Sequence, residues 1–233
     1  MDEAEFDKFA SQYRDMHAAN IKISGEEPEY FAEYKIVDIA REWNSTPRSR
    51  EGAIKVLDFG AGVGYSVPFF ARHLPHARVT CLDVSSKSLD IGQARLGNQA
   101  DFMHFDGKTI PYPDAHFDIG FASCVFHHIP HGEHAGLLRE IHRVIKPGGM
   151  MFVFEHNPLN PLTRHAVNTC PFDENADLIL APVMRRRLQD SGFESTRVCY
   201  RIFFPAFLRK LRPFERQFAW LPLGAQYYVA AQC

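Results

Sequence analysis

The sequence predicts an α/β fold built on a doubly wound, mostly parallel sheet of seven strands. Strand-like and helical segments alternate through the middle of the chain, a glycine-rich turn follows the first strand, and two more strand-like segments lie near the end. The 233 residues, 45% of them hydrophobic and 23% charged, suit one globular domain. An antiparallel hairpin near the C-terminus and a helical cover at the N-terminus complete the expected fold.

Helical spacing marks the first part of the chain. Aromatic residues recur at intervals of three and four from Phe6 to Tyr13, and a second helix is expected over about residues 30–43. A polar, proline-containing linker follows. We therefore expect residues 1–51 to form a helical lid and residues 52–233 to form the core.

Five strand-like segments follow in the core, separated by helices or turns. The strands are expected over 55–59, 78–82, 101–105, 117–122 and 150–154. The helices between them are expected from the first turn to about residue 74, over 86–96 and over 133–145, the last one stopping at Lys146-Pro147-Gly148-Gly149. The hairpin strands are expected over 193–204 and 226–231.

Composition excludes several classes of protein. No apolar run approaches the roughly 20 residues of a membrane span, and the acidic N-terminus is unlike a secretory signal. Five widely spaced cysteines without a C-x-x-C pair argue against a disulfide framework or a zinc site. We therefore expect a protein of the reducing cytoplasm that binds no metal.

A glycine-rich turn carries the sharpest signal. Gly60, Gly62 and Gly64 follow a strand and precede a helix, which is the setting in which such a turn binds an anionic group. Their spacing differs from the G-x-G-x-x-G of dinucleotide sites. Asp83 ends the second strand, where a carboxylate can accept hydrogen bonds from ribose hydroxyls. These residues predict a cofactor that contains a ribose and no pyrophosphate.

In order and spacing, these motifs resemble those of the class I S-adenosylmethionine-dependent methyltransferases. Asp58–Gly64 is similar to their first motif, Asp83 to their ribose-binding acid, and Phe105-Asp106-Gly107 to the segment that meets the adenine. Ser123–Ile129 is similar to the end of their fourth strand. The resemblance covers about residues 52–155 and continues into the hairpin. It implies a Rossmann-like fold, S-adenosyl-L-methionine as methyl donor and S-adenosyl-L-homocysteine as product.

The cofactor residues expected from this resemblance combine the glycine turn with groups at the strand ends. They are Tyr13, Asp58, Gly60, Ala61, Gly62, Gly64, Asp83, Val84, Asp106, Gly107 and Ser123. Three of the acids have structural alternatives. Asp58 could pin the loop, Asp83 could cap the following helix, and Asp106 with its glycine could form a simple turn.

The class of acceptor decides whether a catalytic base is needed. A hydroxyl acceptor needs a general base, whereas a carboxylate is already ionised and needs only a positive or hydrogen-bonding clamp. His128 and His156 follow the fourth and fifth strands and are the candidate bases. His128 could instead belong to the cofactor shell or serve a structural role.

Two segments are predicted to lie on the substrate side as insertions in the core, over 156–185 and 205–223. In the first, Asn157, Arg164 and Asp173 are the expected substrate-binding residues, although an ordered connector explains them too. The second interleaves basic and aromatic residues. It could touch a membrane surface through residues 205–220, or it could be an amphipathic helix that caps the pocket.

The sequence therefore predicts methyl transfer by in-line displacement to an oxygen of a small or carrier-linked acceptor, either a sugar hydroxyl or a carboxylate. A peptide C-terminal carboxyl group is the main alternative acceptor. A nicotinamide-dependent oxidoreductase and a non-catalytic cofactor-binding module are weaker alternatives. No nucleic-acid partner is expected, and the oligomeric state is left open.

Overall fold

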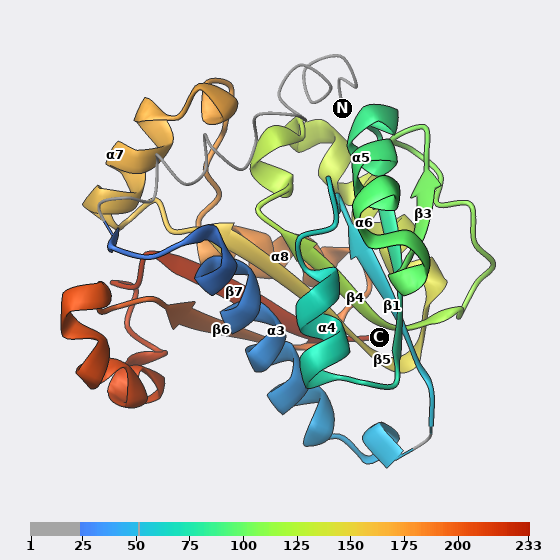
Figure 1. Cartoon of the computed structure of the whole chain (residues 1–233), viewed down its shortest axis with the longest axis horizontal. Coiled ribbons are helices and arrows are strands. Elements are labelled where there is room, and N and C mark those ends of the chain that lie inside the picture. The colour runs from blue at the N-terminus through green and yellow to red at the C-terminus, as the bar shows by residue number, and fades with distance from the viewer. Residues whose placement is uncertain (1–23, 51) are drawn as a thin grey trace.

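The computed structural model describes residues 24–50 and 52–233, and a seven-stranded sheet runs through it (Figure 1). The strands are β1 (Ile54–Phe59), β2 (Ala77–Asp83), β3 (Asp101–His104), β4 (Phe117–Ser123), β5 (Ile145–His156), β6 (Glu194–Arg201) and β7 (Gln226–Gln232). Their order is β3-β2-β1-β4-β5-β7-β6. The first five strands are parallel, and β7 pairs antiparallel with both β5 and β6. The predicted fold class is confirmed.

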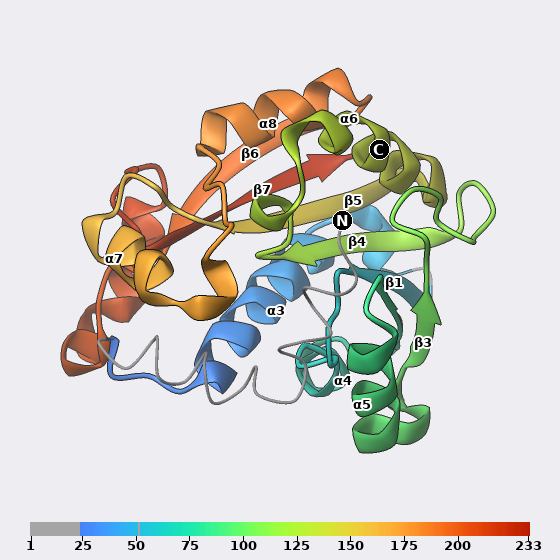
Figure 2. The ribbon, with the colours of Figure 1, turned by 90° about the horizontal axis from the view of Figure 1, so that it is seen from above.

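Helices cover both faces of the sheet. The α-helices are α3 (Pro28–Asn44), α4 (Val67–His73), α5 (Ser86–Leu96), α6 (His131–Val144), α7 (Pro161–Thr169) and α8 (Ala181–Asp190). The 3-10 segments are η2 (Pro47–Arg50), η3 (Gly97–Gln99), η4 (Phe126–His128), η5 (Pro171–Asp173) and η6 (Ala206–Phe218). Figure 2 shows α3, α4 and α5 on one face and α6 and α8 on the other. Each face has its own cluster of buried apolar side chains.

Helix α3 confirms the helix predicted over about residues 30–43. Pro28 occupies its first turn, where a missing N–H costs nothing. Ile36, Ile39 and Trp43 are almost completely buried against the sheet, so this helix is a fixed part of the core on that face. The helix predicted around Tyr13, and with it the first part of the predicted lid, lies outside the described residues.

One predicted turn is a strand in the structure. Helix α6 ends at Val144 and β5 begins at once, so Lys146–Gly149 belongs to β5 rather than to a turn before it. Ile145 is already extended and pairs with Phe117 of β4. A glycine is needed at Gly149 because a Cβ there would lie 2.8 Å from the carbonyl oxygen of Asp118. The glycine therefore allows close strand approach instead of ending the pairing.

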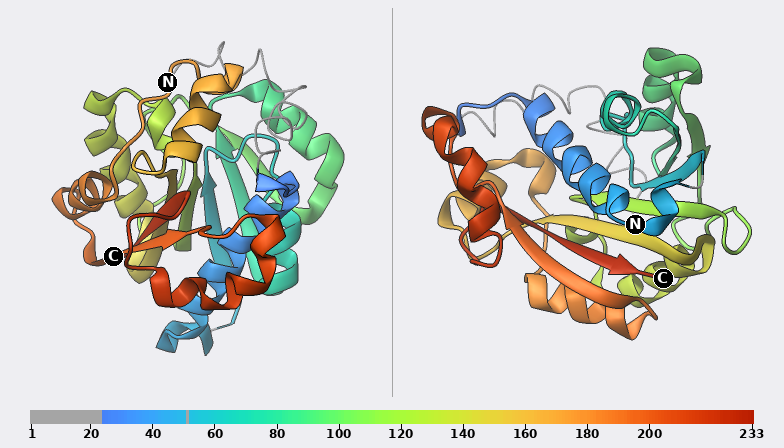
Figure 3. Two further views of the ribbon diagram at one scale, coloured as in Figure 1. Left: turned by 90° about the vertical axis from the view of Figure 1, so that its left-hand side faces the viewer. Right: turned by 90° about the horizontal axis from the view of Figure 1, so that it is seen from below.

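Both predicted insertions lie at one edge of the sheet. Strand β5 leads into α7, and η6 joins the end of β6 to the start of β7. Figure 3 shows α7 and η6 on this side of the molecule in the left-hand panel. Within the described residues, no helix has the length and apolar character that crossing a bilayer requires. The carboxyl ends of β1, β2, β4 and β5 meet at this same edge, which is where ligands of such sheets bind.

Candidate functional site

The glycine turn lies between β1 and α4 and is fastened to the neighbouring strand. The backbone N–H groups of Gly60 and Ala61 donate to the Leu82 carbonyl, over 2.8 and 3.2 Å. Gly60 has a φ of 71°, and a Cβ there would lie 2.6 Å from the side chain of Val125. Only glycine therefore lets the turn pass this close to the segment that follows β4.

Asp83 joins this turn to the end of β2. Its Oδ2 accepts from the Gly62 N–H at 2.7 Å and its Oδ1 from the Ser85 N–H at 2.9 Å. Burial raises the pKa of the Asp83 carboxyl group, although these backbone donors oppose the rise. The helix cap of α5 is Ser85, which accepts from the Ser88 N–H. Asp83 is therefore not the side-chain cap of α5, and with buried Val84 it lies beside the glycine turn.

Asp58 and Asp106 make local contacts of the kind expected if each acid only stabilises its own loop. Asp58 is buried, its Oδ2 accepts from the Ser66 hydroxyl, and burial raises its pKa to about 7. Asp106 is exposed, and its Oδ1 accepts from the N–H groups of Lys108 and Thr109, each at 2.8 Å. These contacts hold the two loops in shape. A direct contact of either acid with the cofactor stays a prediction.

Sequence reasoning missed a buried lysine. Lys35 of α3 is 5% exposed, and its Nζ donates to the Ser123 hydroxyl at 2.7 Å and lies 3.7 Å from Cys124 Sγ. Burial raises the pKa of the Cys124 thiol, but the charges of Lys35 and His156 outweigh burial and lower the pKa to about 7. A lysine within the buried face of a predicted helix was the available sequence signal, since a buried cation calls for a partner.

A cluster of acids and imidazoles lies at the ends of β4 and β5. His127 Nδ1 is 2.5 Å from Glu155 Oε2, and the other oxygen of this carboxylate accepts from the Phe126 N–H at 2.8 Å. Asp173 Oδ1 lies 3.7 Å from His127 Nε2 and 3.5 Å from His128 Nε2. The structure thus unites two predicted residues, His128 and Asp173, with Glu155 and His127, which the predictions had left out.

The adjacent imidazoles of His127 and His128 have very different pKa values. Burial lowers the pKa of His127, but the Glu155 carboxylate outweighs burial and raises the pKa to about 10. Burial and the neighbouring His127 charge lower the pKa of His128 to about 3. Burial raises the pKa of Asp173, but the neighbouring imidazoles of His127, His156 and His128 together outweigh burial and lower the pKa to about 2. At neutral pH, His127 is therefore cationic, His128 is neutral, and the carboxylates are ionised.

The same cluster is the group of side chains within the described residues that could hold a metal ion. Ligand atoms of His127, His128 and Asp173 lie within 4.8 Å of one another. A cationic imidazole has no lone pair to give a metal, so pairing with Glu155 opposes metal binding at His127. The absence of a metal stays a prediction, and the contacts are those of an ion-pair network.

His156 lies beside this network and beside Cys124. Its ring centroid is 5.2 Å from that of His127, and its Nδ1 is 3.5 Å from Gln226 Nε2. Burial lowers the pKa of His156, but the Cys124 thiolate outweighs burial and raises it. Tyr34 of α3 donates to Gln226 Oε1 at 2.5 Å, which fixes the amide. His156 is thus a stronger base than His128.

Two predicted substrate-binding residues lie away from this cluster. Asn157 is 1% exposed, and its amide donates to the carbonyls of Pro222 and Gly224 at 3.1 and 2.8 Å. These buried bonds occupy the side chain, so we correct Asn157 from an acceptor contact to a residue that joins the two insertions. Arg164 is exposed on α7. The third residue, Asp173, lies in the cluster, and Tyr13 is outside the described residues.

Comparison with known proteins supports the fold and bears on the stretch of chain that carries the cofactor motifs. Residues 57–153 match the family model of a methyltransferase domain. This stretch holds the glycine turn, Asp83, Asp106 and the end of β4. Over this stretch the chain is similar to the class I S-adenosylmethionine-dependent methyltransferases. The similarity favours S-adenosyl-L-methionine as the methyl donor and argues against the nicotinamide-dependent alternative.

Curated relatives of the chain share one name. A ubiquinone/menaquinone biosynthesis C-methyltransferase UbiE of Ectopseudomonas mendocina is 33% identical over 125 residues, which are 51% of this chain and 48% of that protein. The UbiE of Pseudomonas putida is 30% identical over the same length. The chain thus spans about half the length of the curated relatives it matches.

Solved structures share the fold of this methyltransferase at low sequence identity. A methyltransferase from Thermotoga maritima has a TM-score of 0.66 at 17% identity, with 98% of each chain covered. The phosphoethanolamine N-methyltransferase 2 of Haemonchus contortus, solved with S-adenosyl-L-methionine, has a TM-score of 0.59 at 16% identity, covering 85% of this chain and 52% of that one.

The residues around the glycine turn fit S-adenosyl-L-methionine. The Asp83 carboxylate accepts a hydrogen bond from the glycine turn. Because Gly60 has no side chain, the turn packs directly against Val125, which follows β4. Asp83 would hold the ribose of the donor, and the turn would lie along its methionine part. The donor would supply an electrophilic methyl group, and Ser123 at the end of β4 and the following Cys124 would lie on its side of the sheet.

Proposed function

We propose that this methyltransferase transfers the methyl group to an oxygen atom of an acceptor bound beside Lys35, Cys124 and His156. The observation that carries the proposal is the buried Lys35, which has no carboxylate partner within the described part of the chain. A buried ammonium group is costly unless it is paired. An anionic acceptor oxygen near the end of β4 would give this ammonium group a partner in addition to the Cys124 thiolate.

The site supports two classes of oxygen acceptor. For a hydroxyl group, His156 receives the proton in the molecules whose His156 imidazole is neutral, because the pKa of His128 is too low for an effective base. For a carboxylate, Lys35 neutralises the acceptor and no base is needed. The acceptor is thus a sugar or other hydroxyl compound, or a carboxylate that is small, carrier-linked or at the end of a peptide.

The rest of the cluster orients these groups. Glu155 holds His127, which holds Asp173 near His128, so the ion-pair network forms a polar wall beside His156. Tyr34 and Gln226 fix the opposite side of the His156 ring. Methyl transfer is an in-line displacement, so a rigid wall contributes by aligning the acceptor and excluding water.

Methylation of a carbon atom is the second candidate function. Its support is the name of the UbiE relatives, C-methyltransferases of ubiquinone and menaquinone biosynthesis. A carbon next to an ionised oxygen of an aromatic ring could use the same Lys35 and His156. Mild base releases the methyl group of a methyl ester only, and NMR of a ¹³C-methyl-labelled product separates a methyl ether from a methylated carbon.

The test uses methyl-labelled S-adenosyl-L-methionine with an extract of candidate acceptors, followed by the variants Lys35→Met and His156→Gln. For a carboxylate acceptor, Lys35→Met should lower kcat/KM about 10- to 150-fold, the equivalent of a charged hydrogen bond of about 1.5–3 kcal/mol, and His156→Gln should have little effect. For a hydroxyl acceptor, His156→Gln should lower kcat by about 10²–10⁴.

Matched controls are Lys87→Met and His131→Gln, which change exposed residues on α5 and α6. Both controls should keep wild-type activity, and all four variants should bind the methyl donor normally. Full activity in both site variants, or label attached stably to a ring carbon, would overturn the proposal of an oxygen acceptor.

A further inference from the structure

Exposed apolar side chains are concentrated at one edge of the molecule. Eleven large hydrophobic side chains are exposed in the described residues, and eight of them come from two short segments. We call these eight the apolar rim: Leu159, Leu162, Phe207, Leu211, Phe214, Phe218, Trp220 and Leu223. Phe207 is 83% and Trp220 is 73% exposed. Such a concentration of apolar surface marks an interaction site.

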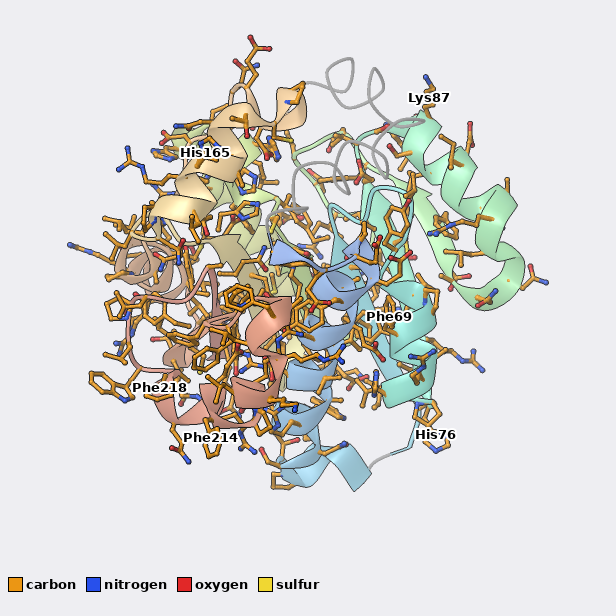
Figure 4. The ribbon with its side chains drawn as sticks, turned by 60° about the vertical axis from the view of Figure 1, so that its left-hand side comes forward. Phe69, His76, Lys87, His165, Phe214 and Phe218 are labelled. Atoms are coloured by element: carbon orange, nitrogen blue, oxygen red, sulfur yellow. The ribbon has the colours of Figure 1, made fainter. Side chains whose placement is uncertain are left out.

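The apolar rim is attached directly to the candidate site. Asn157, the residue after His156, holds the carbonyls of Pro222 and Gly224, and Thr163 of α7 donates to the Ala225 carbonyl at 2.9 Å. The two segments of the rim are therefore fixed to each other. Figure 4 shows Phe214 and Phe218 on η6 and His165 on α7 on one side of the molecule.

The charges on η6 explain which partner suits this surface. Arg209, Lys210 and Arg216 are exposed and pair with no carboxylate among residues 24–50 and 52–233. The one acid of η6, Glu215, is 3% exposed and accepts from the N–H groups of Phe203 and Phe204 at 3.0 and 3.1 Å. The outward surface of η6 is therefore apolar and basic.

We propose that the apolar rim docks on an anionic phospholipid bilayer, so that the acceptor reaches the site from the membrane. Aromatic side chains favour the interface between headgroups and acyl chains, and nearby Arg and Lys side chains are attracted to anionic lipid. The docking follows from the surface alone. The identity of the acceptor as a lipid-carried molecule rests in addition on the proposed function.

A bilayer suits the rim better than a second copy of the chain. A pair of identical rims would bring the unpaired cations of two η6 segments together, and like charges repel. On an anionic bilayer, these same cations and aromatic side chains contribute together. The apolar side chains are spread over two short segments, and this also suits a flat surface. Each side chain would enter the surface only to shallow depth.

The experiment measures sedimentation of the full chain with vesicles of phosphatidylcholine alone and of phosphatidylcholine mixed with phosphatidylglycerol. Binding is expected to the mixed vesicles and to weaken as salt rises. Arg209→Gln with Lys210→Gln should weaken it about fivefold for each charge removed. Phe207→Ser with Trp220→Ser should weaken it at least tenfold. Leu180→Ser with Val183→Ser is the matched control, since these exposed apolar residues lie outside the rim.

Docking is overturned if the wild-type chain stays in solution with both kinds of vesicle, or if the rim variant binds as well as the control. It is also overturned if light scattering shows a dimer that the rim variant separates, because the rim would then be covered by a second copy. Donor binding and methylation of a soluble acceptor, measured on the same variants, report separately on the proposed function.

Discussion

Glu155 and His127 form a buried pair at the ends of two central strands. The imidazole and the carboxylate are each 1% exposed, so contact between the two groups replaces their contact with water. Breaking such a pair by removing one partner is strongly destabilising, because a charge is left in the interior without compensation. The pair therefore matters for the shape of the site before any acceptor arrives.

Glu155→Gln should lower the free energy of unfolding by about 3 kcal/mol at pH 7. The pKa of His127 is raised to about 10 in the folded chain, so its stabilising contribution is full below pH 6.5 and is lost as the pH rises through about 10. The difference between wild type and variant should therefore shrink between pH 7 and pH 10.

Urea unfolding of both proteins across this pH range measures the difference, with Glu133→Gln on the exposed face of α6 as the control. A difference that stays constant across the range would show that His127 is not held as a cation.

Among the site residues, those next to a recognisable motif could be predicted from the sequence. His128 and His156 are such residues, whereas Asp173 was a candidate because it lies in a polar insertion; His128 and Asp173 lie 3.5 Å apart, and the roles of all three stay predictions. Lys35 could not be predicted, because its contact with Ser123 joins residues 88 positions apart and depends on how α3 crosses the sheet. Asn157 was predicted to bind the acceptor, but its amide donates to backbone carbonyls. Packing decides whether a polar side chain faces a ligand or the backbone, and the sequence does not show packing.

At the scale of elements, a buried carboxylate is among the contacts that hold η6. Glu215 accepts from two backbone N–H groups just after β6 and lies 3.7 Å from Arg201. Arg212 also pairs with Glu26, and the Phe218 ring lies 6.1 Å from that of Phe203. Glu215 is the buried residue of η6, so its bonds should matter most for the position of the segment.

Glu215→Ala should therefore loosen η6 while leaving the sheet in place. We expect faster cleavage by protease within residues 206–218 and a global loss of only about 1–3 kcal/mol. Limited proteolysis with mass spectrometry checks this, with Glu194→Ala at the exposed start of β6 as the control. Equal cleavage of both variants would show that other contacts hold η6.

The regular elements were predictable where pattern and local chemistry agree. Helix α5 spans the predicted residues 86–96, since Ser85 caps it and Gly97 ends it. Helix α7 lies in the predicted insertion 156–185, for which no helix was predicted. Its signal was present, because Asn160 caps the helix and Pro161 occupies its first turn. The prolines of this segment suggested a loop, although Pro161 lies in the first turn of a helix.

At the scale of the whole molecule, the methyl donor should stabilise the fold by mass action. A ligand at 100 times its Kd adds about 2.7 kcal/mol to the free energy of unfolding. Asp83→Asn should weaken donor binding about 10- to 150-fold and remove most of this stabilisation. Thermal unfolding with and without donor measures it, and Asp101→Asn on the exposed start of β3 is the control. An undiminished thermal shift in Asp83→Asn would refute the ribose assignment.

The sheet order has a consequence for synthesis of the chain. Strand β6 touches the rest of the sheet only through β7, which follows it in the sequence. A ribosome therefore releases β6 before the strand that must separate it from β5 exists. During that interval β5 has an unpaired edge, and such edges favour wrong pairing. Slow translation between β6 and β7 would prolong this exposure, so codon choice over residues 202–225 bears on the yield of correctly folded protein.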